Sequence, residues 1–370
     1  MDTLAKRSIK HCLDMLAPFE PSEASLEEGQ RQFYRLMVSI WQGMYENPEK
    51  YLVFPDPYEK YMGSRRMRAA RRKEKEHVSD SRESTLRNTI QQAIQFYAAF
   101  FFEAGLASTE PDQPSGGMII PQREYALVLE RMNRFHGAEH HAGRYERLAE
   151  CGVSIREKDG MVYIAHETLR QAMDGALYLC RAPESKYKWM NFLRLDFKNA
   201  YAPAPAVADI CRTLPAERAA LVRELEAQLS GMRVKARIKP LRGIVSDFKW
   251  KVEYACQGKN ICGFYADNSY FMLCIYFNSH ENINRLAALL YGEDRALFEW
   301  FRDQFPERLC ACPNNRRVFF GQEPRRICGL SNRAEIVSPD REDVERAMYV
   351  MKRFRGLEGN ENGSYTGRKR

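Results

Sequence analysis

The sequence has no apolar run long enough to cross a membrane. Its most apolar patch, residues 97–102, is followed directly by Glu103, whereas a transmembrane helix needs roughly 18 or more apolar residues in succession. The N-terminal stretch also lacks the continuous apolar core of a secretory signal. Its apolar residues instead share one stripe of an amphipathic helix, formed by Leu4, Ile9, Cys12, Leu13 and Leu16. We therefore expect no membrane span.

Cysteine, glycine and proline are scarce: there are 10, 22 and 17 of them among 370 residues. This cysteine density is far below that of disulfide-rich secreted domains, so we expect a cytoplasmic protein with reduced thiols. The low glycine and proline content excludes a collagenous or low-complexity chain. With 44% hydrophobic and 29% charged residues, the chain is expected to fold into two or three domains with sizeable cores.

Common enzyme motifs are absent from the sequence. There is no P-loop, no G-x-G-x-x-G after a strand, no G-x-S-x-G and no carboxylate-rich metal run. This argues weakly against a nucleotide-dependent enzyme, because many active sites are assembled from residues far apart in the chain.

Residues 1–110 are predicted to form a helical region. One helix ends at Asn47-Pro48, and a second covers 84–104, with Ser84 as its N-cap and Gly105 just beyond its end. Residues 108–117 are rich in proline, glycine and small polar residues, which predicts a linker. The helical spacing in the first part of this region is carried by Leu26, Phe33, Met37, Ile40, Trp41 and Met44.

Residues 118–235 predict a winged-helix-like unit followed by further helices. The order is helix, helix, hairpin and helix, and Asp159-Gly160 favours a type I′ turn between the two strands. The second helix is in the position of a recognition helix. It is expected to present His141, Arg144 and Arg147 outward, together with acidic residues that make groove insertion less favourable.

Residues 236–357 are predicted to form an α+β domain with an antiparallel sheet, so the fold class of the whole chain is α+β. Residues 248–256 alternate between apolar and polar, which predicts a half-buried strand, whereas 270–277 are apolar on both faces and suit a central strand. Ser338 is expected to cap the last helix. The composition of residues 358–370 predicts disorder.

Three blocks of sequence resemble segments of other proteins. They are RAPESKYKWMNFLRLDF (181–197), a long block over 238–286, and a block over 308–336 that begins RLCACPNNRRVFF. These blocks resemble a group of uncharacterised proteins from clostridia and related Firmicutes, and the last two resemble the DUF3788-type α+β domain. The resemblance covers about the C-terminal half. It implies a bacterial source and a fold, and it brings no activity and no catalytic residue.

A cysteine group in this half could hold a metal. Cys310, Cys312 and Cys328 supply three thiolates, and a structural zinc site usually has four ligands. Cys262, Cys274 or His280 would have to supply the fourth. Structural zinc is therefore one hypothesis, and buried thiols or redox-active thiols are the others. Nearby arginines would favour the thiolate form.

Residues His136, Glu139 and His140 match the H-x-x-E-H pattern of inverted zinc peptidases. That chemistry requires an uninterrupted helix, because only then do the two histidines share a face. Gly137 follows the last periodic residue and indicates the end of a helix. We therefore expect these residues to lie in a loop and to bind no metal.

The chain carries an excess of positive charge, with a formal net charge of +8. The densest cluster is within residues 65–75. Such density attracts phosphates with an affinity that falls steeply with salt, so nucleic acid is one predicted partner; an acidic protein or membrane surface, or plain solvation, are the alternatives. The cluster consists of Arg65, Arg66, Arg68, Arg71, Arg72, Lys73 and Lys75.

Aromatic residues gather on the strands predicted for the C-terminal domain. An aromatic-lined concave sheet suits a small-molecule ligand, although such residues also build ordinary cores. The candidate ligand-binding residues are Trp250, Tyr254, Tyr265 and Tyr276.

Together these patterns favour a non-catalytic cytoplasmic binding or regulatory protein. It would have a ligand or metal site in the C-terminal domain and a basic surface for nucleic acid. The alternatives are a metal- or thiol-dependent hydrolytic enzyme and a scaffold that holds a partner.

Overall fold

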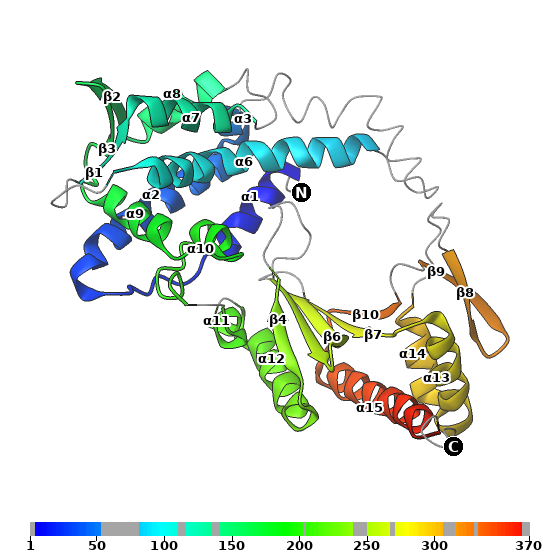
Figure 1. Ribbon diagram of the computed structural model, residues 1–370. Helices are drawn as coiled ribbons and strands as arrows, with labels where there is room; N and C mark the ends of the chain where they lie inside the picture. Colours follow the sequence, from blue (N-terminus) through cyan, green and yellow to red (C-terminus); the bar gives the residue numbers. More distant parts are fainter. Residues whose placement is uncertain are drawn as a thin grey trace, which may run out of the picture. The chain divides into compact units, whose positions relative to one another are not determined.

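The chain folds into two units, seen here in a computed structural model (Figure 1). The structure describes residues 4–52, 81–109, 116–134, 141–202, 205–212, 214–239, 250–266, 271–305, 315–328 and 332–364. The first unit holds the described residues up to 212, and the second holds those from 214 onward. The fold class is α+β, as the sequence predicts. None of the helices in the described ranges is long and apolar enough to span a membrane.

The first unit is mostly helical and carries a small antiparallel sheet with strand order β1-β3-β2. One continuous hydrophobic core runs through it from Ala5 to Ala200. Its elements are α1 (Leu4–Met15), η1 (Ala24–Leu26), α2 (Glu27–Glu46), α3 (Pro48–Leu52), α6 (Ser81–Ala107), β1 (Gly117–Pro121), α7 (Gln122–Met132), α8 (His141–Glu150), β2 (Val153–Lys158), β3 (Met161–His166), α9 (Ala172–Arg181), α10 (Lys188–Arg194) and α11 (Val207–Arg212).

The second unit is built on a five-stranded antiparallel sheet with strand order β10-β7-β6-β5-β4. Figure 1 shows α12 and α15 on one face of this sheet, and a separate β8–β9 hairpin beside α13 and α14. Its elements are α12 (Ala216–Leu229), η3 (Ser230–Met232), β4 (Lys235–Ile238), β5 (Trp250–Cys256), β6 (Lys259–Ala266), β7 (Phe271–Tyr276), α13 (His280–Glu293), α14 (Arg295–Asp303), β8 (Asn315–Phe320), β9 (Glu323–Cys328), β10 (Arg333–Val337) and α15 (Arg341–Ser364).

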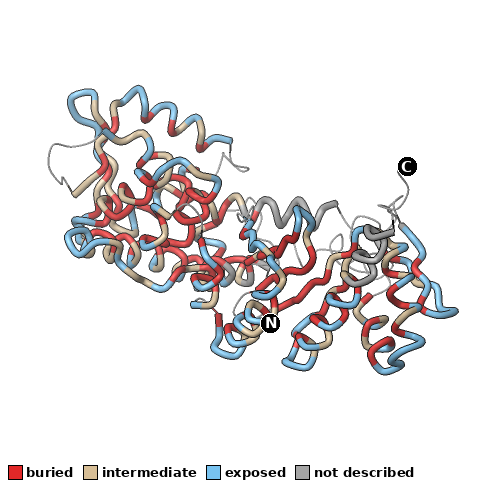
Figure 2. The backbone as a smooth tube through the Cα atoms, turned by 60° about the horizontal axis from the view of Figure 1, so that its bottom comes forward, coloured by how far each residue is buried: buried red, intermediate tan, exposed pale blue. Residues whose placement is uncertain are grey.

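Several local predictions agree with the structure. The periodic residues from Phe33 to Met44 form the buried face of α2, which ends just before Asn47. Asp159 and Gly160 both adopt positive φ between β2 and β3, as a type I′ turn requires. Strand β7, which is apolar on both faces, is an interior strand of its sheet and lies between β6 and β10. Figure 2 shows buried positions running through the helices and strands of both units, with exposed positions at their turns.

The predicted division into three domains differs from the two units observed. Residues 108–117 do not separate two domains, because Thr109 donates a backbone hydrogen bond to Ile119 (2.8 Å) inside the first unit. The second boundary lies near residue 213, not 235, so α12 and β4 belong to the C-terminal unit. These boundaries depend on long-range packing, which local composition does not report.

Both predicted ends of the last helix are also corrected. Asp340, not Ser338, caps α15: its side chain accepts from Asp343 N (2.8 Å), and its own N–H donates to Asp343 Oδ2 (3.2 Å). Ser338 instead has a positive φ of 51°. The helix continues to Ser364, so 358–364 are helical where the composition predicts disorder. Residues 365–370 lie outside the described ranges.

Gly105 has a packing role and does not end its helix, which continues to Ala107. The glycine is buried against α9, where a Cβ atom would overlap the sulfur of Cys180. Gly175 of α9 makes a similarly close approach to the carbonyl oxygen of Gly29 on α2. Glycine therefore lets three helices of the first unit cross closely.

Replacing Gly175 with alanine should lower the free energy of unfolding of the first unit by about 1–3 kcal/mol, because the added methyl group pushes α2 and α9 apart. Urea denaturation followed by circular dichroism measures the change. Gly292→Ala is the matched control, since nothing lies within 4 Å of the added Cβ in α13. That substitution should be neutral or slightly stabilising. An equal loss in both variants would contradict the packing role.

Candidate functional site

The five-stranded sheet has two chemically different faces. Successive residues of a strand point to opposite faces, and the register places Trp250, Val252 and Tyr254 of β5 across from Ala266, Phe264 and Cys262 of β6. Tyr254 donates to Glu226 of α12 (3.0 Å), so this face is the one that the helices cover. The aromatic residues on it belong to the core.

The opposite face carries charged and hydroxyl-bearing side chains, and we call it the charged sheet face. The register brings its members together from all five strands and from the residue after β4, Lys239. Five of them are cations and two are carboxylates. Its members are Lys235, Arg237, Lys239, Lys251, Glu253, Tyr265, Cys274, Tyr276, Arg333 and Glu335.

Glu253 is the buried centre of this face, with only 3% of its surface exposed. Its carboxylate pairs with Lys239 (2.9 Å) and Lys251 (3.0 Å), and it accepts a hydrogen bond from Asn260 (2.8 Å). Burial by itself raises the pKa of Glu253, but the hydrogen bonds from the two lysines outweigh it and hold the pKa below its usual range. The carboxylate is therefore charged at neutral pH and fixes both ammonium groups.

Tyr265 lies between two cations. Arg333 donates to its hydroxyl (3.0 Å) and stands over its ring, with Cζ 5.4 Å from the centroid. Lys251 Nζ lies 5.2 Å from the same centroid. Burial opposes a charge on Lys251, but contacts with Tyr265 and Glu253 raise its pKa above the usual value. These contacts hold both cations in defined positions.

Arg333 and Tyr276 face each other across β10 and β7. Arg333 also forms an ion pair with Glu335 (2.7 Å), which orients the guanidinium group. Burial raises the pKa of Tyr276, so its hydroxyl stays protonated and can donate a hydrogen bond. The result is a row of donors at neighbouring positions: an ammonium, a guanidinium and a phenol.

The cations keep access to solvent although Glu253 does not. Half of the Lys239 side chain is exposed, as are 31% of Lys251 and 21% of Arg333. Each ammonium group has three donors, so bonding to Glu253 leaves capacity for another acceptor. Chemically, this arrangement can hold an anion through charge-assisted hydrogen bonds.

The predicted aromatic site is divided between the two faces. Trp250 and Tyr254 lie under the helices, whereas Tyr265 and Tyr276 lie on the charged sheet face. The four residues therefore do not line one surface, because the side chains of neighbouring positions on a strand point to opposite faces.

The sequence analysis did not predict Glu253, Arg333 and Glu335 as members of a site. Charged and apolar residues alternate along 333–336, and this pattern could have predicted that Arg333 and Glu335 share one face of a strand.

The predicted half-burial of 248–256 is wrong over β5, where Glu253 and Ala255 are buried together with their apolar neighbours. Residues 248 and 249 lie outside the described ranges. Alternation predicts that Lys251 and Glu253 share a face of β5, but the other partners of Glu253 come from elsewhere in the sheet: Lys239 follows β4 and Asn260 lies on β6.

The zinc hypothesis for the cysteines stays a prediction. Cys310 and Cys312 lie outside the described ranges, and Cys328 ends β9 opposite Asn315. Within the ranges that the structure describes, no three histidine, cysteine or acidic side chains are placed to hold a metal ion. The motif of His136, Glu139 and His140 and the basic cluster within 65–75 also lie outside these ranges.

The proposed recognition helix, α8, does not present its cations as predicted. His141 and Arg144 are buried, and Arg144 donates two hydrogen bonds to the carbonyl of Leu52 (3.3 and 3.2 Å) while lying over Phe96. Arg147 pairs with Glu150 of its own helix. The reason is that this side of α8 packs against α3, which ends at Leu52, and against α6, which contains Phe96.

Comparison of the chain with protein-family models, with curated proteins and with solved structures finds no match. The resemblance to the DUF3788-type domain stays a prediction.

Proposed function

We propose that this protein is a non-catalytic binding protein whose C-terminal unit takes a small anionic ligand on the charged sheet face. The observation that carries the proposal is the excess of cations there, five against two carboxylates, with Lys251 and Arg333 held in place and partly exposed. A carboxylate or phosphate group would complete their hydrogen bonding. Tyr265 and Tyr276 would contact the rest of the ligand.

The electrostatics of the same residues favour binding over acid–base catalysis. A general base works best with a pKa near the operating pH, whereas the lysines hold the pKa of Glu253 below its usual range. The other carboxylate, Glu335, is paired with Arg333. Both carboxylates therefore serve to position cations.

Titration calorimetry with separate probes tests this proposal. Inorganic phosphate, succinate and adenosine monophosphate represent free phosphate, carboxylates and nucleotides, and adenosine is the uncharged comparison. We expect at least one anion to bind and adenosine not to bind. Lys251→Gln should weaken that binding by about 10- to 100-fold, since a hydrogen bond to a charged group contributes about 1.5–3 kcal/mol.

The matched control is Arg223→Gln, an equal charge change at an exposed position of α12. It should leave anion affinity within twofold of the wild type. Thermal unfolding of each variant checks that the fold is intact. No binding of any anion at millimolar concentration, or equal weakening by both substitutions, would refute the proposal.

The order of elements in the first unit supports the winged-helix-like interpretation of its middle segment. Two helices, α7 and α8, stand between β1 and the β2–β3 hairpin, and the sheet order is β1-β3-β2. The buried cations of α8 argue for a packing role of this module and against DNA readout through that helix. The basic cluster within 65–75 remains a predicted nucleic-acid contact.

A further inference from the structure

The β8–β9 hairpin of the second unit has an apolar inner face. Val318, Phe320 and Ile327 are buried, whereas their neighbours on both strands are exposed or half-buried. The backbone N–H of Phe319 donates to Asn284 of α13 (2.7 Å). The hairpin is therefore seated on the helices by one face only.

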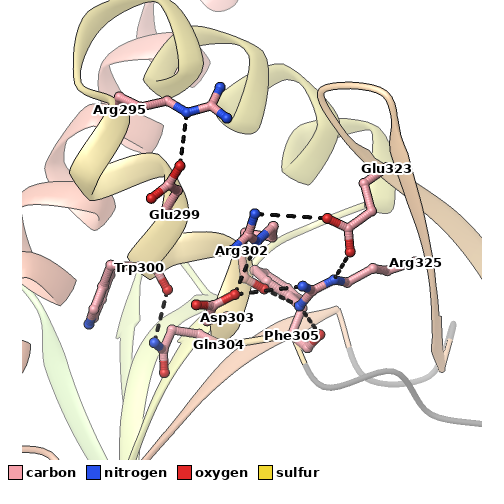
Figure 3. Close-up of polar contacts among 9 residues, drawn as sticks. All are labelled: Arg295, Glu299, Trp300, Arg302, Asp303, Gln304, Phe305, Glu323 and Arg325. Atoms are coloured by element: carbon pink, nitrogen blue, oxygen red, sulfur yellow. Dashed lines mark hydrogen bonds and ion pairs between the residues drawn. The ribbon is translucent and has the colours of Figure 1, made fainter.

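Arg325 anchors this hairpin to the end of α14, as Figure 3 shows. Its guanidinium donates to the carbonyl oxygens of Arg302 (2.9 Å) and Phe305 (3.2 Å). It also pairs with Glu323 (3.0 Å) and lies 3.6 Å from Asp303. The charge of Arg325 is therefore paired, and so are the nearby carboxylates of Asp303 and Glu323.

The outer face is different, because it carries cations and an exposed aromatic ring. The register sets Arg317 directly across from Arg326, and Phe319 across from Pro324. All four are exposed, and Phe319 has 49% of its surface accessible. Arg316 is also exposed, but it pairs with the buried Ile327 and so lies at the edge of the inner face.

The pairing of Arg317 with Arg326 on this outer face does not stabilise the hairpin. Like charges directly opposite each other on paired strands are destabilising, and within the described ranges neither Arg317 nor Arg326 has an acidic partner. The exposed part of the Phe319 ring buries no apolar surface and so contributes no hydrophobic stabilisation. Paired arginines beside an exposed ring are, however, the two elements that single-stranded nucleic acid uses: a basic track for phosphates and a platform for bases.

We propose that the outer face of the β8–β9 hairpin binds single-stranded nucleic acid. Arg317 and Arg326 contact successive phosphates, and a base stacks on Phe319. A duplex fits less well, because its bases are already stacked and paired. This surface is separate from the charged sheet face and goes beyond the function proposed above.

Fluorescence anisotropy with labelled oligo-dT, oligo-U and a duplex of equal length tests this binding on the full chain. The single strands should bind more tightly than the duplex. The double variant Arg317→Glu/Arg326→Glu should weaken single-strand binding at least tenfold. Phe319→Ala should weaken it roughly 5- to 150-fold, the range expected for one stacked base.

Salt dependence identifies the phosphate contacts. Each contact to a single strand contributes about 0.7 to the logarithmic slope, so loss of two contacts should make the slope less steep by about 1.4. The matched control Arg223→Glu/Lys352→Glu makes the same charge change at exposed positions of α12 and α15. It should leave both affinity and slope nearly unchanged.

A stability measurement separates this role from a structural one. Arg326→Glu replaces a repulsive cross-strand pair by an attractive one, so its melting temperature should rise by about 1–3 °C while binding weakens. The proposal is overturned if single strands do not bind, or if the control lowers affinity as much as the hairpin variants. It is also overturned if only reversal of Arg68, Arg71 and Arg72 weakens binding.

Discussion

Replacing Asp196 with alanine should lower the free energy of unfolding of the first unit by about 3–5 kcal/mol, the cost of leaving a buried charge without its partner. Arg194 ends α10, and its Nη2 lies 3.0 Å from Asp196 Oδ2. Both side chains are almost completely buried. Burial lowers the pKa of Arg194 to about 10, against the opposing effect of Asp196, so the guanidinium remains charged at neutral pH.

Asp196 also organises the chain beyond α10. Its carboxylate accepts hydrogen bonds from the backbone N–H (3.2 Å) and the side-chain amide (3.1 Å) of Asn199. Between the ion-paired residues, Leu195 adopts a left-handed conformation with φ of 52°. The left-handed bend at Leu195 thus lies between the two ion-paired residues. Both features are close to the end of the sequence block 181–197 described above.

Urea denaturation monitored by circular dichroism measures the effect, with each unit allowed its own transition. The control is the double variant Arg194→Met/Asp196→Ala, which removes both charges. It should be more stable than Asp196→Ala alone, because no buried cation is left without a partner. A loss below about 1 kcal/mol in the single variant, or a double variant that is less stable still, would contradict the assignment.

Replacing Glu253 with glutamine should lower the free energy of unfolding of the second unit by about 2–4 kcal/mol at pH 7. The carboxylate accepts bonds from Lys239, Lys251 and Asn260, and hydrogen bonds to a charged group contribute about 1.5–3 kcal/mol each without full additivity. The neutral amide leaves two ammonium groups facing each other. Their partial exposure keeps the expected loss below that of a fully buried pair.

The same residue predicts a dependence on pH. The pKa of Glu253 is lowered in the folded state, so its contribution to stability is complete above the pKa of an unfolded glutamate, about 4.3. That contribution is lost as the pH falls from there through the lowered pKa. Glu253→Gln should therefore lack this part of the acid dependence.

Thermal unfolding between pH 3 and pH 7 checks both statements. Glu299→Gln is the control, since Glu299 forms an exposed pair with Arg295 on α14, and such pairs contribute little. Its stability and pH profile should match those of the wild type. An unchanged pH profile in Glu253→Gln would show that Glu253 is not the titrating group.

Local patterns were sufficient to predict many elements. The periodicity of 33–44 marked α2, the dipeptide Asp159-Gly160 marked the β2–β3 turn, and the apolar run 270–277 marked an interior strand. In each case the determinant is a backbone preference or a spacing within one element. Helical and strand periods are properties of neighbouring residues, so sequence alone reports them.

Other features depend on partners that are distant in the chain. Gly105 was predicted to end a helix, but it allows α6 to pack closely against Cys180 of α9. Arg144 was predicted to be exposed, but it is buried and donates to the carbonyl oxygen of Leu52. Arg333 reaches Tyr265 only because β6, β7 and β10 pair in one particular register. Nothing near these residues in the sequence identifies such contacts.

Spacing along the chain was therefore enough to predict the α+β class, most helices and strands, and the alternation of side chains within one strand. What covers each face became visible in the packed fold: a helix over Tyr254, lysines around Glu253, and, within the described part of the chain, no acidic partner opposite Arg317 and Arg326. Periodicity is a property of one element, whereas burial and charge pairing depend on whichever element packs against it.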